Sequence, residues 1–237
     1  VEVIKAQGIT ITNLCYIDGL APYAGCRTCI VEIEGARPTP LQLSCTAVIA
    51  EGMVVNTEAP AAHEARRQCL EFLLKDHPLD CPICDQAGEC GLQDYAYKYG
   101  RTGKRFCEEK ITQPKKDIGP HVLLYSDRCI MCTRCVRFTD EITGTGELLI
   151  DGRGATESID VFPGQALDNP LSGCVVDICP VGSMIDKDFL FVQRVWYLKS
   201  TPSIDGLTAS GDNIILEHND GEMYRIKPRE NVAINRW

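Results

Sequence analysis

The segment RCIMCTRCVRF, residues 128–138, places a cysteine at every third position, and this stretch decides the fold. Cys129, Cys132 and Cys135 are followed far downstream by Cys179, which stands directly before a proline. A loop that presents a thiolate at every third residue can reach three corners of a cubane, and a remote Cys-Pro closes the fourth. Zinc sites more often take their cysteines in pairs. The spacing alone therefore predicts a 4Fe–4S cluster.

The residues around this loop predict a small α+β unit. We expect one helix to leave the loop and stop near Gly144, and a second helix within residues 168–180 to deliver Cys179. Between them, ELLI (147–150) and ESIDVF (157–162) have the composition of short strands that flank a glycine-rich turn. A bacterial two-cluster ferredoxin would need four more cysteines, so this ferredoxin-like unit houses a single cubane.

A second group of cysteines lies near the N-terminus. Its members are Cys15, Cys26, Cys29 and Cys45. The group resembles a plant-type 2Fe–2S site with a stretched first gap, where a loop supplies three cysteines and a later strand end supplies the fourth. Gly19 and Gly25 would let the loop bend closely around the inorganic sulfurs. The alternation of Ile/Val with Glu in IVEIEG (30–35) predicts a strand that leaves the site.

The third group is one thiolate short of a cubane. It contains Cys81, Cys84 and Cys90, and the nearest candidate for a fourth ligand is His77. Alternatively, His77 merely ends the preceding helix, where a cationic side chain suits the helix dipole and Pro78 stops the helix. An imidazole in place of a thiolate would make the cluster less negative and raise its potential. Position alone leaves both interpretations open.

Three further elements follow from local patterns. The segment after Pro60 predicts an amphipathic helix whose apolar face includes Cys69 as a buried core thiol, and a tyrosine-rich helix closed by Gly100 is expected to cover the third group. Residues 101–120 form a polar connector, whose basic side chains are either a docking patch or a solvated loop. The words NIILEH, NDGE and MYRIKP predict a β-hairpin close to the C-terminus.

Composition excludes several classes of protein. An apolar content of 44% supports packed cores, no apolar run is long enough to cross a bilayer, and a net charge of −9 argues against a nucleic-acid partner. The 14 cysteines are too sparse for a small disulfide scaffold, although disulfides remain an alternative. A zinc-binding structural module is the alternative from a different functional class. Cys107 and Cys174 receive no ligand role.

Four segments of the sequence together resemble one protein family. This family is the large iron–sulfur subunit of respiratory complex I, which is the NADH:quinone oxidoreductase. The segments are AGCRTCIVEIEG (24–35), EFLLKDHPLDCPICDQAGECGLQDYA (71–96), RCIMCTRCVRFTDEITG (128–144) and DICPVGSMIDKDF (177–189). The resemblance implies an electron-transfer subunit of an oxidoreductase, with no substrate chemistry on this chain. It implies a peripheral-arm protein that passes electrons from NADH and FMN on a partner subunit toward quinone.

The resemblance also implies a cofactor set and its ligands. A 2Fe–2S cluster would be held by Cys15, Cys26, Cys29 and Cys45. One 4Fe–4S cluster would be held by His77, Cys81, Cys84 and Cys90, and a second by Cys129, Cys132, Cys135 and Cys179. No molybdopterin is expected, and FMN would lie only on the partner subunit. Arg27, Arg128, Arg134 and Arg137 lie in or beside the cluster loops. We hypothesise that at least one raises a cluster potential, the alternative being that they pair with surface carboxylates.

We expect four domains in an α+β chain. They are a ubiquitin-like (β-grasp) 2Fe–2S ferredoxin unit at 1–57, a helical His/Cys3 unit at 58–112, a ferredoxin-like 4Fe–4S unit at 113–195 and the start of a molybdopterin-oxidoreductase-like β domain at 196–237. Family members usually carry a β-hairpin before the first of these, so the chain is expected to be part of a longer protein. Relatives with a further cluster have cysteines at the positions of Asp205, Thr208 and Asp212, so no fourth cluster is expected.

The runner-up within the same chemistry is the diaphorase-linked iron–sulfur subunit of an NAD-reducing hydrogenase or an NAD-dependent formate dehydrogenase. In the leading interpretation, the partners are the FMN/NADH-binding subunit and other peripheral-arm subunits, and the membrane arm is reached through them. Cluster assembly needs a reducing compartment. We therefore expect a peripheral position on the cytoplasmic side of the bacterial inner membrane, or on the matrix side in a mitochondrion.

Overall fold

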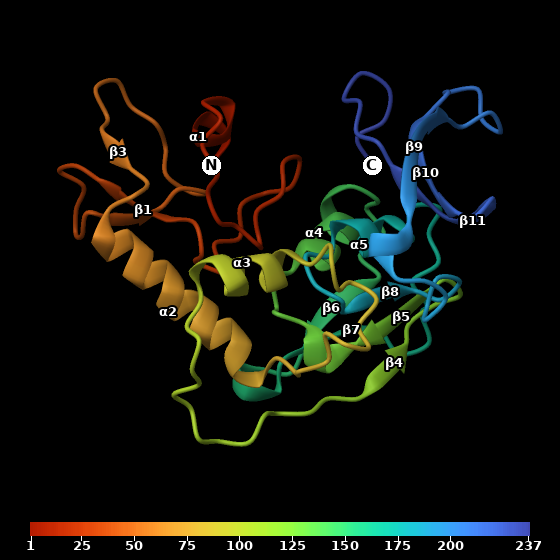
Figure 1. Ribbon diagram of the computed structural model, residues 1–237, viewed down its shortest axis with the longest axis horizontal. Coiled ribbons are helices and arrows are strands. Elements are labelled where there is room, and N and C mark those ends of the chain that lie inside the picture. The colour runs from red at the N-terminus through yellow and green to blue at the C-terminus, as the bar shows by residue number, and fades with distance from the viewer.

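Five α-helices and four small β-sheets make up the computed structural model, which describes residues 1–237 (Figure 1). The helices are α1 (Glu2–Ala6), α2 (Pro60–Asp76), α3 (Gly91–Tyr99), α4 (Arg134–Glu141) and α5 (Cys174–Ile178). The strands are β1 (Ile30–Ile33), β2 (Leu41–Leu43), β3 (Val55–Asn56), β4 (Lys115–Asp117), β5 (Val122–Tyr125), β6 (Leu148–Asp151), β7 (Ser158–Val161), β8 (Met184–Asp186), β9 (Lys199–Ile204), β10 (Asn213–Asn219) and β11 (Glu222–Pro228). This mixed content is the α+β class that the sequence predicts.

The first sheet has the order β2-β1-β3, with both pairings antiparallel. Val31 and Ile33 of β1 are buried while their neighbours are not, so the predicted alternating strand is confirmed. Helix α2 packs against β1, and the buried Arg66 donates from Nε to the carbonyl of Ile30 at 2.7 Å. This contact joins the start of α2 to the first sheet.

Helix α2 begins at Pro60 as predicted, but its buried face differs from the expected one. The fully buried positions are Ala62, Arg66 and Leu70. Cys69 lies at the flank of this face and is only half-buried, so the expectation of a core thiol is corrected. The sequence pattern did not predict the burial of Arg66. This side chain can be buried because its guanidinium donates hydrogen bonds to the carbonyls of Ile30 and Thr57.

The central unit combines the sheet β4-β5-β8 and the hairpin β6-β7 with helices α4 and α5. Its core holds twelve buried residues, among them Phe138, Leu124 and Ile159. The strands predicted at 147–150 and 157–162 are confirmed as β6 and β7. Strands β4, β5 and β8 were not predicted, because each is three or four residues long and carries no clear periodicity. Strand β4 lies inside the predicted connector.

The C-terminal sheet has the order β11-β10-β9 and contains the predicted hairpin. Asp220 and Gly221 at its turn both have positive φ, as a tight hairpin turn requires. The third strand, β9, was missed because Pro202 breaks the strand pattern, and its place at the sheet edge tolerates the proline. Beyond the sheet, the chain returns to the central unit, where Trp237 packs edge-on against Phe138 with ring centroids 5.2 Å apart.

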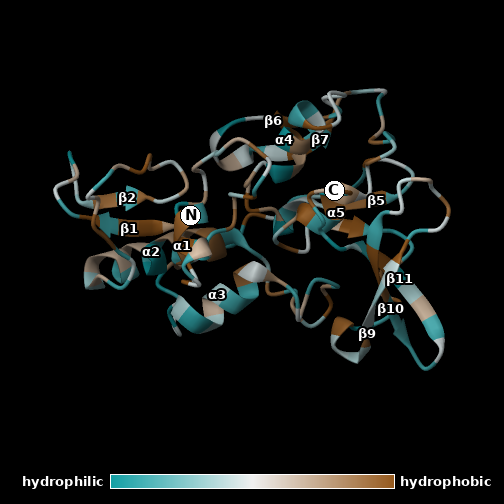
Figure 2. Cartoon of the chain, turned by 90° about the horizontal axis from the view of Figure 1, so that it is seen from above, coloured by the Kyte–Doolittle hydropathy of each residue, from teal (hydrophilic) through white to brown (hydrophobic).

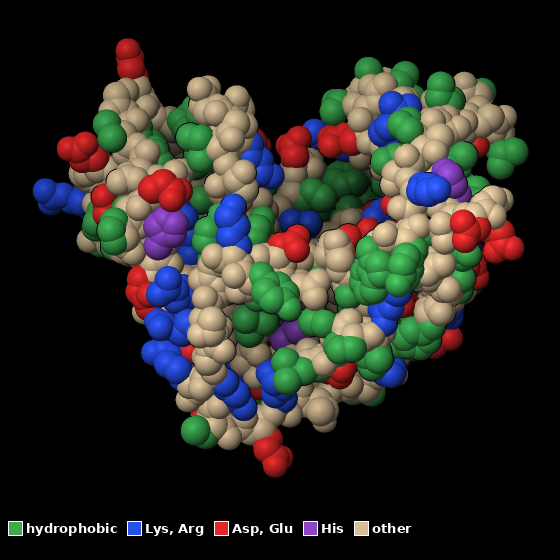
Figure 3. Space-filling view, in the orientation of Figure 1, with side chains coloured by type: hydrophobic (Ala, Val, Ile, Leu, Met, Phe, Trp, Pro, Cys, Tyr) green, Lys and Arg blue, Asp and Glu red, His purple; other side chains and the backbone are tan.

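The first sheet with α2 and the C-terminal sheet form two lobes above the central unit, separated by a notch in the space-filling view (Figure 3). Strands β1 and β5 are coloured hydrophobic and α3 largely hydrophilic in Figure 2, which agrees with the buried faces of the two strands. None of the helices combines the length and apolar character needed to cross a bilayer.

Candidate metal centres

The four cysteines of the central unit line one small enclosed cavity. They are Cys129, Cys132, Cys135 and Cys179, and three come from the loop before α4 while the fourth caps the end of α5. Met131 and Thr133 adopt left-handed conformations with φ of 49° and 58°. These two bends separate the three loop cysteines and turn their side chains toward a common space.

Burial disfavours free thiolates in this cavity. It raises the pKa of Cys129 to about 11 and that of Cys132 to about 12. A buried thiol becomes a thiolate only when a cation or a metal core compensates its charge. The four residues therefore fit a metal cluster through donor type, shared cavity and exclusion of water.

The N-terminal cysteines form a second buried group (Cys15, Cys26, Cys29 and Cys45). Hydrogen bonds from Cys26 and Cys45 lower the pKa of Cys15 to about 2, and a hydrogen bond from Cys45 lowers that of Cys29 to about 6. The backbone N–H of Cys15 also donates to the sulfur of Cys26 at 3.3 Å. The four thiols are therefore in mutual contact, as the ligands of one small cluster would be.

Two glycines shape the loop of this group for different reasons. Gly19 has φ of 90°, which only glycine adopts readily, and it lies against Trp237. Gly25 has no such bend; a Cβ at this position would collide with the ring of Tyr23. The loop bends instead at Ala24 and Arg27, which both have positive φ.

His77 and the third group of cysteines lie between α2 and α3. Burial lowers the pKa of His77 to about 4, so its imidazole is neutral and able to ligate a metal. Its Nδ1 is buried and has no hydrogen-bond partner. His77 does end helix α2, as the alternative interpretation holds, but that role leaves the orphaned nitrogen unexplained. The orphan favours the ligand interpretation.

The three cysteines of this group differ in exposure. Cys84 and Cys90 are buried, whereas Cys81 is exposed. The Cys84 sulfur lies so close to Gly182 that a Cβ there would collide with it, and the Cys90 thiol donates to the carbonyl of Pro180 at 3.8 Å. The third group therefore touches the segment that directly follows Cys179.

One apolar cluster joins all three groups. Its buried members include Cys15 and Cys26 of the N-terminal group, Cys90 of the third group and Cys132 of the central unit, and Cys179 packs against it. Leu14, Leu70 and Leu92 fill the space between them. The sequence did not reveal this convergence, because the cysteines come from segments far apart along the chain.

Arg128 is the most completely buried of the arginines noted in the sequence, with 1% of its surface exposed. Its guanidinium donates to Asp80 Oδ2 at 2.8 and 3.0 Å and stacks on the ring of Tyr125 at 4.0 Å. It therefore pairs with a carboxylate, as the alternative interpretation has it, but inside the protein. Arg27 is exposed.

The remaining cysteines stand apart from the three groups. Cys107 is exposed, Cys174 packs half-buried against the central core, and all fourteen thiols are unpaired. No three His, Cys, Asp or Glu side chains have the geometry to hold a single metal ion.

The positions of Asp205, Thr208 and Asp212 lie in and beside the exposed loop between β9 and β10. The Thr208 hydroxyl donates to Asp205 Oδ2 at 3.0 Å, and the Asp205 backbone N–H donates to the Asp212 carbonyl at 2.8 Å. These residues hold the loop together through their own hydrogen bonds.

Models of three protein families match successive parts of the chain. A 2Fe-2S iron-sulfur cluster binding domain matches residues 1–60, the NADH-ubiquinone oxidoreductase-G iron-sulfur binding region matches residues 66–105, and the ferredoxin-like domain of NADH-quinone oxidoreductase subunit 3 matches residues 119–185. The chain thus contains one 2Fe–2S region and further 4Fe–4S regions. None of the three models covers the C-terminal sheet.

Curated relatives are similar over nearly the whole chain. The mitochondrial NADH dehydrogenase [ubiquinone] iron-sulfur protein 1 of Solanum tuberosum is 43% identical over 234 residues, which are 99% of this chain and 31% of the relative. The NADH-ubiquinone oxidoreductase 75 kDa subunit of Reclinomonas americana is 44% identical over 228 residues, which are 96% of this chain and 33% of the relative. The chain thus spans about a third of their length.

A solved structure shares the fold. It is a crystal structure of an NAD+-reducing [NiFe]-hydrogenase in the H2-reduced state, with a TM-score of 0.72 and 29% identity over 82% of each chain. The curated relatives are more similar to this chain in sequence than the hydrogenase chain is. Their names agree with two of the three family models. Over the third of their length that it spans, the chain is similar to the large (75 kDa) iron–sulfur subunits of NADH-quinone oxidoreductase.

Proposed function

We propose that the chain is an electron-transfer part of an NADH:quinone oxidoreductase and relays electrons through one 2Fe–2S and two 4Fe–4S clusters. The observation that carries the proposal is the single apolar cluster in which cysteines of all three groups meet. Electrons tunnel only over short distances through a protein, so a relay requires neighbouring sites. The names and domains of the relatives agree with this role.

The proposed ligands follow the three groups. Cys15, Cys26, Cys29 and Cys45 hold the 2Fe–2S cluster. His77, Cys81, Cys84 and Cys90 hold one 4Fe–4S cluster, and Cys129, Cys132, Cys135 and Cys179 hold the other. The clusters supply reversible one-electron chemistry. The chain contributes the ligands, excludes water from most of the thiols, and donates backbone hydrogen bonds to sulfur, such as that from the Met131 N–H to the Cys129 sulfur at 3.3 Å.

Partners and location belong to the same proposal. Electrons reach the chain from NADH and FMN on a partner subunit and leave toward quinone through other peripheral-arm subunits. The membrane arm is reached through those partners, on the cytoplasmic side of a bacterial inner membrane or the matrix side in a mitochondrion. Residues 196–237 are proposed to begin a molybdopterin-oxidoreductase-like domain without its cluster.

The proposed domain boundaries remain those at 57, 112 and 195, although α2 contacts elements on both sides of the first boundary. Its first half packs on β1, and its end carries His77. We therefore propose that α2 couples the first two units structurally.

Metal analysis of anaerobically purified protein tests the proposal. We expect brown protein with about ten irons per chain, two plus four plus four. Cys179→Ser should lose about four irons. The matched control Cys174→Ser should keep all ten, because Cys174 only packs against the central core. Colourless protein that contains zinc, or equal iron in the two variants, would contradict the proposal.

A second candidate is the diaphorase-linked subunit of an NAD-reducing hydrogenase, because the solved structure with the same fold comes from such an enzyme. Both candidates predict the same clusters but different partners. Purification of the complex from its native source distinguishes them: a nickel–iron subunit supports the second, and a quinone-reducing membrane arm supports the first.

A further inference from the structure

Two arginines on α4 lie between the N-terminal cysteine group and the cysteines of the central unit. Helix α4 begins directly at the CxxCxxC loop, and Arg134 and Arg137 are one turn apart on it. The loop from Cys15 to Ala21 lies against this helix. Both side chains reach across the boundary between the two units.

Each guanidinium donates to the backbone of both groups at once. Arg137 Nη2 donates to the carbonyl of Cys15 at 2.7 Å and to that of Cys132 at 3.2 Å. Arg134 Nη2 donates to Tyr16 at 2.7 Å, and its Nη1 donates to Ile178 at 3.0 Å. Tyr16 follows Cys15, and Ile178 precedes Cys179. Two hydrogen-bonded bridges therefore connect proposed ligands of the two clusters.

The charge on these side chains is not neutralised by an acidic partner. The ion pairs of the chain include neither Arg134 nor Arg137, and Arg134 Nε is buried without a hydrogen-bond partner. Arg134 donates to Tyr16 on the side of the N-terminal group and to Ile178 on the side of the central unit. The Arg134 cation is thus shared between the two groups.

Arginine has the geometry for this role and lysine lacks it. The planar guanidinium presents several N–H groups in fixed directions, whereas an ammonium is a point charge on a flexible stem. A cation near a cluster stabilises the reduced, more negative state and so raises its potential. A fixed bridge keeps the separation of two clusters constant, and the tunnelling rate depends steeply on that separation.

We propose that Arg134 and Arg137 are positioning residues that hold the 2Fe–2S site against the Cys129–Cys179 4Fe–4S site and place a shared positive charge between them. The proposal rests on the proposed function, because it requires both clusters. It deepens that function by naming the residues that determine how these two sites communicate.

A redox titration followed by electron paramagnetic resonance tests the charge. In the cluster-loaded protein, Arg134→Gln and Arg137→Gln should each shift the midpoint potentials of both clusters to more negative values. The matched control is Arg236→Gln, which also removes one positive charge and a tie to the same loop, the ion pair with Asp18 at 2.6 Å. Arg236 is half-buried, but its charge is balanced by Asp18 and Glu230, so the control should shift neither potential.

The lysine variants test the bridge separately. Arg134→Lys and Arg137→Lys keep the charge, so both potentials should stay close to those of the parent protein. A lysine at either position can keep only one of the two backbone hydrogen bonds that the guanidinium makes. The magnetic coupling between the two reduced clusters should therefore become weaker or vary more from molecule to molecule. If a glutamine variant fails to assemble its clusters, the lysine variants still test the proposal through the magnetic coupling.

Three results would overturn the proposal: potentials unchanged in both glutamine variants, a shift confined to one cluster, or coupling unchanged in both lysine variants. A parent protein without any cluster signal would instead refute the proposed function, and this proposal with it. The two failures are therefore distinguishable.

Discussion

Individual residues carry backbone conformations that no motif reveals. Ala24, Arg27, Met131 and Thr133 adopt positive φ within the proposed cluster loops, although none is glycine. Each such residue costs about 1 kcal/mol relative to an extended or helical backbone. Such strain persists where the surroundings over-determine the conformation, and it concentrates at functional sites. The placement of these residues beside the cysteines agrees with that rule.

His77 allows a prediction with a control on the same helix. His77→Cys keeps a fourth ligand but replaces a neutral imidazole with a thiolate, so one 4Fe–4S midpoint should move to more negative potential. His63→Cys is the control, because His63 lies at the solvent-facing side of α2 and pairs with Glu58 at 2.9 Å. Redox titration measures both; an unchanged set of potentials in His77→Cys would exclude His77 as a ligand.

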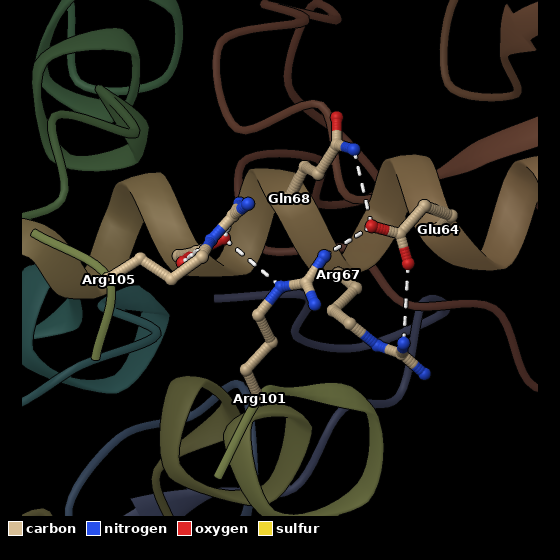
Figure 4. A network of polar contacts seen from close by, with 6 residues as sticks. Glu64, Arg67, Gln68, Arg101 and Arg105 are labelled. Atoms are coloured by element: carbon tan, nitrogen blue, oxygen red, sulfur yellow. Dashed lines mark hydrogen bonds and ion pairs between the residues drawn. The ribbon is translucent and has the colours of Figure 1, made fainter. Parts of the chain in front are cut away.

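Among the secondary-structure elements, helix α2 connects several parts of the chain, because it makes contacts near both of its ends and along its side. Lys110 donates to the carbonyls of Leu74 and Lys75 at 2.9 and 2.8 Å, which satisfies the end of the helix before His77. Figure 4 shows Arg101 and Arg105 of the connector facing Glu64 and other residues of α2. Arg101 and Arg105 thus pair with acidic side chains of α2, and Lys116 of the same connector pairs with Asp160.

Glu71 is the centre of this contact and allows a second prediction. Arg105 Nε donates to it at 2.6 Å and Arg101 Nε lies 3.3 Å away; the hydrogen bond from Arg105 lowers the pKa of Glu71. A carboxylate with a lowered pKa stabilises the fold above its ordinary pKa, and this contribution disappears as the pH falls through the lowered value. The connector should therefore loosen in acid.

Hydrogen exchange of residues 101–110 measures this release. Glu71→Gln should raise the exchange rates of the connector at neutral pH and remove their dependence on salt. Glu108→Gln, an exposed acid in the same connector that joins no ion pair, is the control and should change neither. Equal exchange in the two variants would show that the ion pairs do not hold the connector.

At the scale of the whole molecule, the C-terminal sheet is attached to the third cysteine group by half-buried charges. Arg225 donates to both oxygens of Glu89 at 2.9 and 2.8 Å, and Lys227 adds a contact at 3.1 Å. Glu89 directly precedes Cys90. The sheet is thereby fixed against the loop that supplies a proposed ligand.

Removal of the Glu89 charge should detach this sheet. Burial opposes ionisation of Glu89, but Arg225 and Lys227 outweigh it and lower its pKa. Glu89→Gln should therefore cost about 2 kcal/mol of stability at neutral pH. In the parent protein, the same stabilisation should fade as the pH falls below the ordinary glutamate pKa of about 4.3.

Thermal unfolding of the cluster-loaded protein measures the loss, and hydrogen exchange in β10 and β11 locates it. Glu222→Gln is the control, because this exposed glutamate on β11 contacts only the hydroxyl of Tyr224, at 3.4 Å. A Glu89→Gln variant as stable as the control would mean that the sheet is held by apolar contacts instead.

Local patterns in the sequence determined much of this protein. Cysteine spacing, the proline that begins α2, the glycine after α3 and the Asp-Gly turn of the C-terminal hairpin each act within a few residues, so they can be read without a structure. The ligand candidates, the long helix and the hairpin follow from them. Strands β4, β5 and β8 escaped prediction because they are short and carry no clear periodicity, and β9 escaped it because Pro202 interrupts its pattern.

Only the tertiary structure decided how these parts meet. The burial of Arg66 and Arg128, the exposure of Cys81, the half-buried position of Cys69 and the bridges from α4 all depend on contacts between distant segments. Spacing states which residues can bind a metal core, because ligation is a local property of a loop. It does not state which cores lie side by side, because that depends on packing of the whole chain around one shared apolar cluster.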